Sequence, residues 1–263
     1  MNHSNSHRLR QLKKLSLVIA TKNDLYNAKY TTPLFRLQSS LTRTLHNAED
    51  TNLEIIIVDY GSDEKIENVL EINDKRIKFI YIDKEECEKY DTPFNEVKCI
   101  NRGAKHSTGN FVGRIDQDTI VTKKFFDWFN SDKISVNEFY FSGRLELENG
   151  IYSEEGVNNA KHKTWGFSKK QWWKVAVGIF LIPRKVYLEL KGYDESNIYF
   201  NYMEHEFIMR LNQQIKLVNL GKLLDFPFYH IYHTREDAKT RTNNHSTFDE
   251  ENLELVPNRD DWG

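Results

Sequence analysis

The sequence predicts an α/β fold in which helices flank an open, mostly parallel sheet. Apolar runs rich in β-branched residues occur at 15–20 and 54–58. Both are continuous rather than alternating, as expected of strands that are covered on both faces. Between them, residues 33–46 carry a helical stripe of leucines, so strand and helix signals alternate along the chain.

The alternation continues through the first half of the chain. Residues 77–82 predict a third strand and residues 111–115 a fourth. Between these two strands, Thr92 and Pro93 suit an N-cap and a first helical position, which predicts a helix that runs to about residue 106. In an open sheet of this kind the ligand crevice lies outside the carboxyl ends of the strands.

The second half of the chain is less regular. Two further strands and two further helices are predicted there, at 139–141 and 175–182, and at 183–190 and 203–211 respectively. Gly192 is expected to end the first of these helices. Residues 158–173 predict a loop over the site, and the polar residues 234–247 predict a mobile segment.

Composition excludes several classes of protein. Hydrophobic residues make up 39% of the 263 residues, so a sizeable core is expected, and a net charge of −2 disfavours a nucleic-acid coat protein. No apolar run approaches the ~18 residues of a membrane span. The two cysteines, Cys87 and Cys99, form no CxxC pair, so we expect a reducing, cytoplasmic location. A basic cluster in residues 8–14 would permit peripheral membrane contact, although a solubilising lead-in is the favoured interpretation.

The stretch Asp116-Gln117-Asp118 directly follows the predicted fourth strand. Two carboxylates one residue apart at a sheet edge can hold Mg²⁺ or Mn²⁺ against a diphosphate. The alternative is a solvated turn, since the chain has 39 acidic residues. Asp59 also falls at a strand end, where it could accept a hydrogen bond from a base N–H or simply favour a turn.

Two other groups of residues suit chemistry. Glu204 and Glu206 lie two residues apart at the start of a predicted helix, so they cannot share one helix face. One could face the crevice, or both could serve the helix dipole. His230 and His233 are three apart, which allows both imidazoles to reach one ion, although such pairs are more often structural.

These pieces, in this order, resemble the GT-A fold glycosyltransferases, especially the inverting enzymes of family 2. Residues 17–24 are similar to that family's opening strand and nucleotide loop, and residues 54–62 to its next strand and turn. Residues 101–118 resemble its helix-to-strand run and DxD motif, and residues 192–195 its "GfdE" turn. Residues 230–235 look like the metal segment of the β-1,4-galactosyltransferase branch.

The resemblance implies a GT-A fold with a Rossmann-like sheet. Residues 1–14 would be a lead-in, and residues 15–263 one domain. That domain would have a nucleotide-binding half (15–120), an acceptor and catalytic half (121–235) and a mobile C-terminal segment (236–263). It implies a metal-dependent inverting transferase that moves a sugar from a UDP-sugar to a hydroxyl of a glycan or glycolipid acceptor, in surface polysaccharide or glycan synthesis.

The resemblance also implies roles for single residues. Asp118, His230 and His233 would hold Mn²⁺ or Mg²⁺, and Glu204 would be the general base. The nucleotide-sugar would be bound by Thr21, Asn23, Asp59, Asn101, Asp116, Gln117 and Gly178. An aromatic platform for the acceptor is expected from Trp165, Trp172 and Trp173.

Two departures from the family pattern keep other functions open. Tyr60 replaces an aspartate, and Glu204 replaces the usual catalytic aspartate. A non-catalytic sugar-nucleotide-binding subunit is therefore one alternative. A metal-dependent phosphoesterase that uses Asp116, Asp118, His230 and His233 is another.

Overall fold

The computed structural model describes residues 13–26, 28–29, 31–90, 92–147, 161–162, 179–195, 203–212, 214–233 and 261–263. Gly178, the three tryptophans of the expected acceptor platform (Trp165, Trp172 and Trp173), the segment 234–247 and all but two residues of the expected loop 158–173 lie outside the described residues.

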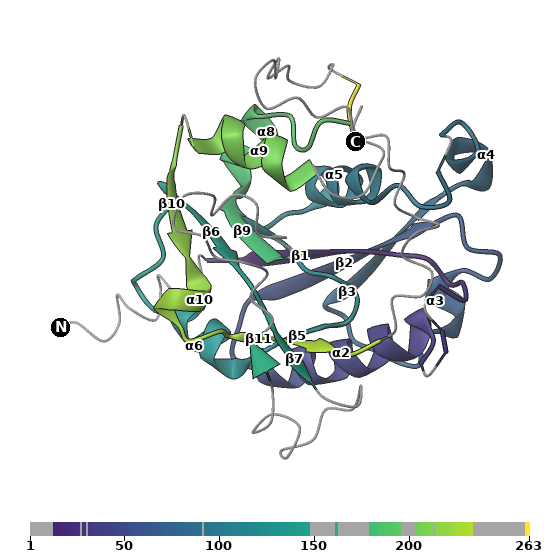
Figure 1. The fold of residues 1–263 in the computed structure, drawn as a ribbon, viewed down its shortest axis with the longest axis horizontal. Coiled ribbons are helices and arrows are strands. Elements are labelled where there is room, and N and C mark those ends of the chain that lie inside the picture. The colour runs from purple at the N-terminus through teal and green to yellow at the C-terminus, as the bar shows by residue number, and fades with distance from the viewer. Residues whose placement is uncertain are drawn as a thin grey trace.

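A seven-stranded sheet forms the middle layer (Figure 1). Its strands are, in spatial order, β10 (Lys216–Asn219), β6 (Glu138–Ser142), β9 (Ile179–Pro183), β4 (Phe111–Arg114), β1 (Leu15–Thr21), β2 (Leu53–Tyr60) and β3 (Ile77–Ile82). Neighbouring strands are parallel except around β9, which is antiparallel to both β4 and β6. The predicted α/β fold with a mostly parallel sheet is confirmed.

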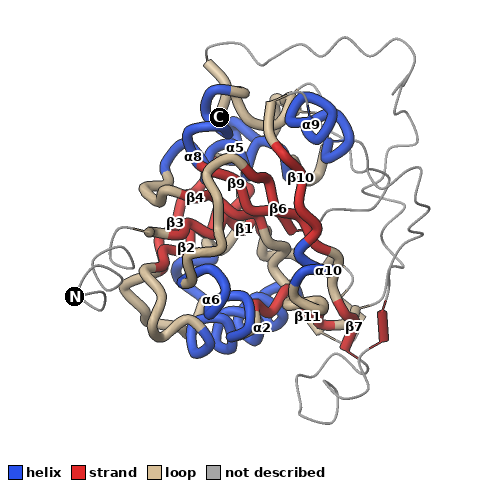
Figure 2. Tube along the Cα trace, turned by 90° about the vertical axis from the view of Figure 1, so that its left-hand side faces the viewer, coloured by secondary structure: helices blue, strands red, loops and turns tan. Residues whose placement is uncertain are grey.

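Helices cover both faces of this sheet, as the side view in Figure 2 shows. The helices are α2 (Pro33–Asn47), α3 (Ile66–Val69), α4 (Lys84–Cys87), α5 (Glu96–His106), α6 (Lys123–Asn130), α8 (Arg184–Glu189), α9 (Met203–Asn212) and α10 (Leu220–Leu223). Leu17 and Ile19 of β1 pack toward α2, whereas Val18 packs toward α5, so consecutive residues of one strand serve two different cores. This explains why the strand is apolar without a break.

Helix boundaries follow the capping chemistry. Thr32 caps α2 by accepting a hydrogen bond from Phe35 N, and Pro33 occupies the first turn. The prediction that Thr92 and Pro93 begin the next helix was wrong by three residues. Asn95 caps α5 through a hydrogen bond from Lys98 N, so the better cap lies closer to the apolar stripe.

Two glycines are required by the packing. A Cβ on Gly103 of α5 would lie 2.3 Å from Cγ1 of Val18, so only glycine lets this helix approach β1 so closely. Gly192 has a φ of +64° and follows α8, as the sequence predicted.

A second sheet of four short strands lies beside α2 (Figure 1). Its strands are, in spatial order, β5 (Thr119–Val121), β11 (Phe228–Ile231), β7 (Leu145–Leu147) and β8 (Lys161–His162). β11 pairs antiparallel with β5 and parallel with β7. None of these four strands was predicted, because runs of two to four residues carry too little hydrophobic periodicity.

Trp262 lies in the segment expected to be mobile, but its side chain is buried against α5 and α8. The ring centroids of Trp262 and Tyr187 are 6.3 Å apart, and Lys105 donates a hydrogen bond to the carbonyl oxygen of Trp262. None of the helices within the described residues combines the length and the apolar character that crossing a bilayer requires.

Candidate functional site

The site lies where the strand order of the main sheet reverses. In the sheet, β1 has β2 on one side and β4 on the other. The chain runs outward from β1 through β2 to β3 and then returns to β4 on the opposite side. The carboxyl ends of β1 and β4 flank this switch point, where open α/β sheets bind ligands. Thr21 ends β1, and its hydroxyl donates a 2.5 Å hydrogen bond to Gln117 Oε1 across the switch point.

Asp118, His230 and His233 come together at this edge, with one ligand atom of each within 4.8 Å of the others. His230 Nε2 lies 3.2 Å from Asp118 Oδ1, and His233 Nε2 lies 3.1 Å from Asp118 Oδ2. The small sheet builds this cluster, because His230 is paired with Thr119, the residue after Asp118. A 2.9 Å hydrogen bond from Ile231 N to Asp118 O closes the contact.

The cluster fits a divalent cation. Asp118 Oδ1 and His230 Nε2 are buried, and among the described residues neither atom has a hydrogen-bond partner of adequate geometry. A bound cation would satisfy both atoms. Burial opposes ionisation of Asp118, but His230, His233 and Arg144 outweigh it and hold its pKa well below the usual range. A carboxylate with two imidazoles suits Mn²⁺ better than Mg²⁺, which prefers oxygen ligands.

Arginines surround the two acids of the motif. Arg144 forms an ion pair with Asp116 Oδ2, and its Nη1 lies 3.8 Å from Asp118 Oδ1. Arg36 of α2 is fully buried, and its Nε lies 3.9 Å from Asp118 Oδ2. Arg114 of β4 lies 3.2 Å from Asp116 Oδ1. Asp116 is thus held between two guanidinium groups.

Arg114 also joins the motif to Glu204. Its Nη1 donates a 2.6 Å hydrogen bond to Glu204 Oε1, so the first turn of α9 is tied to the end of β4. Glu206 has a different role: it forms a buried ion pair with Arg210, whose Nη atoms donate to the carbonyl oxygens of Leu190 and Gly192. The two glutamates therefore face different surroundings, as their spacing of two residues predicted.

A third carboxylate shares Arg114. Glu96, in the first turn of α5, forms an ion pair with Arg114 Nη2. Burial, together with the nearby charges of Asp116 and Glu204, outweighs the attraction of Arg114 and raises the pKa of Glu96 to about 7. This group therefore changes its charge near neutral pH.

Two predicted site residues have other roles. Asn101 is fully buried: its Oδ1 accepts hydrogen bonds from Tyr187 and from Tyr193 N, and its Nδ2 donates to Tyr193 O and Glu195. These bonds use the whole amide to hold the turn at 192–195. In this structure Asn101 thus holds the turn, and its contact with the nucleotide-sugar stays a prediction.

The Asp59 side chain also bonds within the loop that follows it. Its carboxylate accepts hydrogen bonds from the backbone and hydroxyl of Ser62 and from Ile66 N. Ser62 Oγ in turn accepts a 2.8 Å hydrogen bond from Asn23 N, so Ser62 links Asp59 to the loop after β1. This geometry matches the alternative of turn chemistry that the sequence left open.

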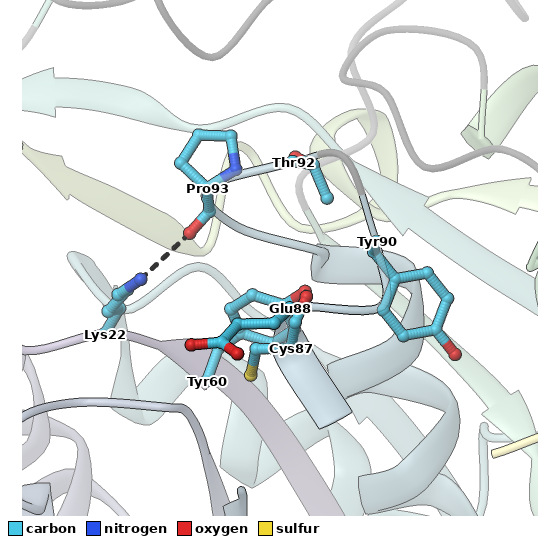
Figure 3. A pocket seen from close by; sticks show the side chains of 7 residues that line it. All are labelled: Lys22, Tyr60, Cys87, Glu88, Tyr90, Thr92 and Pro93. Atoms are coloured by element: carbon cyan, nitrogen blue, oxygen red, sulfur yellow. Dashed lines mark hydrogen bonds between the residues drawn. The ribbon is translucent and has the colours of Figure 1, made fainter. Parts of the chain in front are cut away.

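A cavity of about 500 Å³ opens outside the carboxyl ends of β1 and β2 (Figure 3). It is lined by Lys22, Tyr60, Cys87, Glu88, Tyr90, Thr92 and Pro93. Lys22 donates a 3.0 Å hydrogen bond across it to Pro93 O. Because Lys22 follows Thr21, the cavity adjoins the switch point, and its aromatic and polar lining suits a flat heterocycle.

Sequence reasoning missed the arginines and Glu96. One signal was available: Arg36, Ser40 and Thr44 recur every four residues on α2 and are all buried. Ser40 Oγ donates to Gln117 O, and Thr44 Oγ1 accepts from Val121 N, so this polar stripe faces the segment around Asp118. A second signal was Arg114, a charged residue inside an apolar run. Arg144 has no comparable sequence signal.

Comparison with known proteins places part of the chain in a family. The model of a family described as "Glycosyltransferase like family 2" matches residues 17–137. The matched part runs from β1 through α6 and contains Asp116, Gln117 and Asp118, whereas Glu204 and the two histidines lie beyond it. No curated protein matches the chain significantly.

Proposed function

Because residues 17–137 match a glycosyltransferase-like family 2 and the chain has a GT-A fold, we propose that this transferase is metal-dependent and inverting. Its donor would be a nucleoside-diphosphate sugar, with a UDP-sugar expected, and its acceptor a glycan or glycolipid hydroxyl. One observation carries the proposal. A candidate cation cluster and a candidate base, far apart in the sequence, are connected at the end of β4 through Arg144, Asp116 and Arg114.

Asp118, His230 and His233 would hold the cation, with Mn²⁺ favoured over Mg²⁺ by the two imidazoles. When bound, the cation supplies Lewis-acid stabilisation of the departing diphosphate. Asp116 would act beside it, held in place by Arg114 and Arg144. The side chain of Arg144 is 26% exposed, and its guanidinium could also contact a phosphate.

Glu204 would accept the proton of the attacking hydroxyl. Its side chain is 15% exposed, so it is reachable from the site, and the ion pair with Arg114 engages Oε1. The pair fixes the direction of the carboxylate, as a base needs for proton transfer to a positioned substrate. Attack on the sugar opposite the leaving diphosphate then inverts the anomeric carbon in one displacement.

The nucleoside would lie along the ends of β1 and β2. The cavity in Figure 3 adjoins Thr21 and offers the rings of Tyr60 and Tyr90 together with the Lys22 ammonium. We retain Thr21, Asn23 and Gln117 as donor-binding candidates, because Thr21 bonds to Gln117 at the switch point and Asn23 lies in the loop after β1. Asp59 would shape the loop rather than read the base directly.

The remaining expectations are also proposals. Gly178 would contact the donor, and Trp165, Trp172 and Trp173 would form the platform for the acceptor. A role in surface polysaccharide or glycan synthesis, with a cytoplasmic location and peripheral membrane contact through the basic residues 8–14, fits such an acceptor.

A panel of nucleotide-sugars tests the function. The protein is incubated with each donor and Mn²⁺, and released UDP, GDP and UMP are measured. We expect a UDP-sugar to release UDP, and Asp118→Asn to lose this activity. Asp127→Asn, which changes an exposed aspartate on α6, is the matched control and should retain it.

Other outcomes of this panel favour the alternatives. Release of UMP would indicate cleavage between the phosphates, and hence a phosphoesterase. Donor binding without hydrolysis or transfer under any condition would favour a non-catalytic sugar-nucleotide-binding subunit.

A further inference from the structure

We propose that Arg144 couples cation binding to diphosphate binding, so that the cation binds weakly alone and tightly together with the nucleotide. This inference rests on the proposed function, because it concerns the same cation cluster. It assigns a positioning role to Arg144, which lies beyond the residues that match the family and outside the sequence motifs.

The small sheet places Arg144 at the cluster. Arg144 lies between the end of β6 and the start of β7, and β7 pairs residue by residue with the strand that carries His230. Its Nη1 contacts Asp116 Oδ2 and lies 3.4 Å from Thr119 Oγ1. One guanidinium nitrogen thus sits between the two acids of the Asp-x-Asp motif.

A cation bound to Asp118 Oδ1 would lie close to the positive charge of Arg144. Asp118 Oδ1 lies 3.2 Å from His230 Nε2 and 3.8 Å from Arg144 Nη1. A metal–oxygen bond is about 2 Å long, so a cation on this oxygen would lie within roughly 6 Å of the guanidinium. Arginine stays charged at any working pH, so the repulsion is permanent while Arg144 keeps this position.

Of the three arginines around the motif, Arg144 is the one placed to respond to an anion. Arg36 is fully buried and donates to the carbonyl oxygens of Thr31 and Tyr26. Arg114 is 3% exposed and is held by Glu96 and Glu204 as well as Asp116. Arg144 is 26% exposed and lies on a connection between strands, so its guanidinium can move toward a phosphate.

A diphosphate would change the charge balance around Asp118. Its negative oxygens would neutralise the charge of Arg144 beside Asp118, and they would also offer ligands to the cation. Because coupling between two ligands is reciprocal, the cation must then strengthen nucleotide binding by the same factor. The charge on Arg144 sets the size of that factor.

The test measures Mn²⁺ binding by the electron paramagnetic resonance signal of free Mn²⁺. Wild type, Arg144→Met, Arg144→Lys and Arg43→Met are titrated alone and with UDP or GDP, with titrations lacking protein to correct for Mn²⁺ bound by the nucleotide. Arg43→Met removes an exposed arginine of α2 and is the matched control. Asp118→Asn identifies the binding site.

We expect Arg144→Met to bind Mn²⁺ alone at least about ten-fold more tightly than wild type, since a fixed positive charge is removed. The nucleotide should tighten Mn²⁺ binding much less in this variant. Arg144→Lys, which keeps the charge, and Arg43→Met should both resemble wild type in Mn²⁺ affinity without nucleotide. Circular dichroism confirms that each variant is folded.

Two failures are distinguishable. Equal Mn²⁺ affinity and equal coupling in wild type and Arg144→Met, with binding lost in Asp118→Asn, would overturn the role of Arg144 and leave the proposed function standing. Mn²⁺ binding that is unaffected by Asp118→Asn would overturn the cation site itself, and with it both proposals.

Discussion

At the scale of single residues, the site is a set of carboxylates that share a few arginines. Arg114 contacts Glu96, Asp116 and Glu204, and Arg144 contacts Asp116 and lies near Asp118. A buried guanidinium with several acidic partners holds each of them at a defined distance and direction. Glu204 and Glu206 have different partners although they are two residues apart, because one pairs with Arg114 and the other with Arg210.

Substitution of the two glutamates should separate chemistry from stability. Glu204→Gln is expected to lower kcat by about 10²–10⁴-fold while donor affinity changes little, because a base contributes to proton transfer rather than to donor binding. Glu206→Gln should instead lower the free energy of unfolding by roughly 1–3 kcal/mol by weakening the buried bonds to Arg210. Steady-state kinetics and urea denaturation measure the two effects. Equal kcat in Glu204→Gln and wild type would remove Glu204 as the base.

At the scale of elements, α5 packs closely on β1, and each of the two carries a residue of the candidate site. α5 carries Glu96 at its start, and β1 carries Thr21 at its end. Gly103 allows the approach, since any side chain there would meet Val18. The capping of α5 by Asn95 rather than Thr92 places Glu96 in the first turn, beside Arg114.

Gly103→Ala tests this packing. The added Cβ would lie 2.3 Å from Val18 Cγ1 and 3.1 Å from Val58 Cγ2, so we expect a loss of about 1–3 kcal/mol in the free energy of unfolding. Val18→Ala opens space for the new methyl group. The double variant should therefore be more stable than the sum of the single effects implies, by about 0.5–3 kcal/mol. Strict additivity in urea denaturation would contradict this account.

At the scale of the whole molecule, charged groups from distant parts of the chain are buried together. Their desolvation costs free energy, which packing elsewhere in the fold must offset. Glu96 is the clearest case, since burial and its acidic neighbours raise its pKa to about 7. Trp262 likewise makes long-range contacts, in this case apolar ones, because it packs onto α8 and α5, which come much earlier in the chain.

The raised pKa of Glu96 predicts a pH-dependent stability. The folded protein keeps Glu96 protonated up to about pH 7, whereas the unfolded chain ionises it near 4.5. Its contribution to stability is therefore fully present below about pH 4.5 and is lost as pH rises to about 7. Between pH 5 and 8, wild type should lose more unfolding free energy than Glu96→Gln does. The exposed Glu67→Gln serves as the control, and parallel curves for wild type and Glu96→Gln would contradict the assignment.

Trp262→Ala should destabilise the molecule by about 3 kcal/mol, because the indole is 7% exposed and packs against Tyr187 and the Lys105 side chain. Leu223→Ala, which removes a side chain that is 54% exposed, should leave the melting temperature unchanged. Thermal unfolding measures both variants. A melting temperature of Trp262→Ala equal to that of wild type would show that this contact does not stabilise the fold.

Within the main sheet, β1, β2 and β3 were predictable because they are six to eight residues long and rich in apolar residues. Residues 77–82 were predicted as the strand that the structure contains, and α2 differs from its predicted span by one residue. The small sheet was not predictable, since its strands have two to four residues and take their stability from partners elsewhere in the chain.

The sequence by itself determined the fold class and the order of the chemical groups, because hydrophobic periodicity depends on neighbours within a few residues. Only the tertiary structure decided which of those groups share a site. Arg114 and Glu204 are 90 residues apart, and Arg144 and Asp116 are 28 apart. Ion pairs of this kind depend on the register of two sheets, and no local pattern encodes that register.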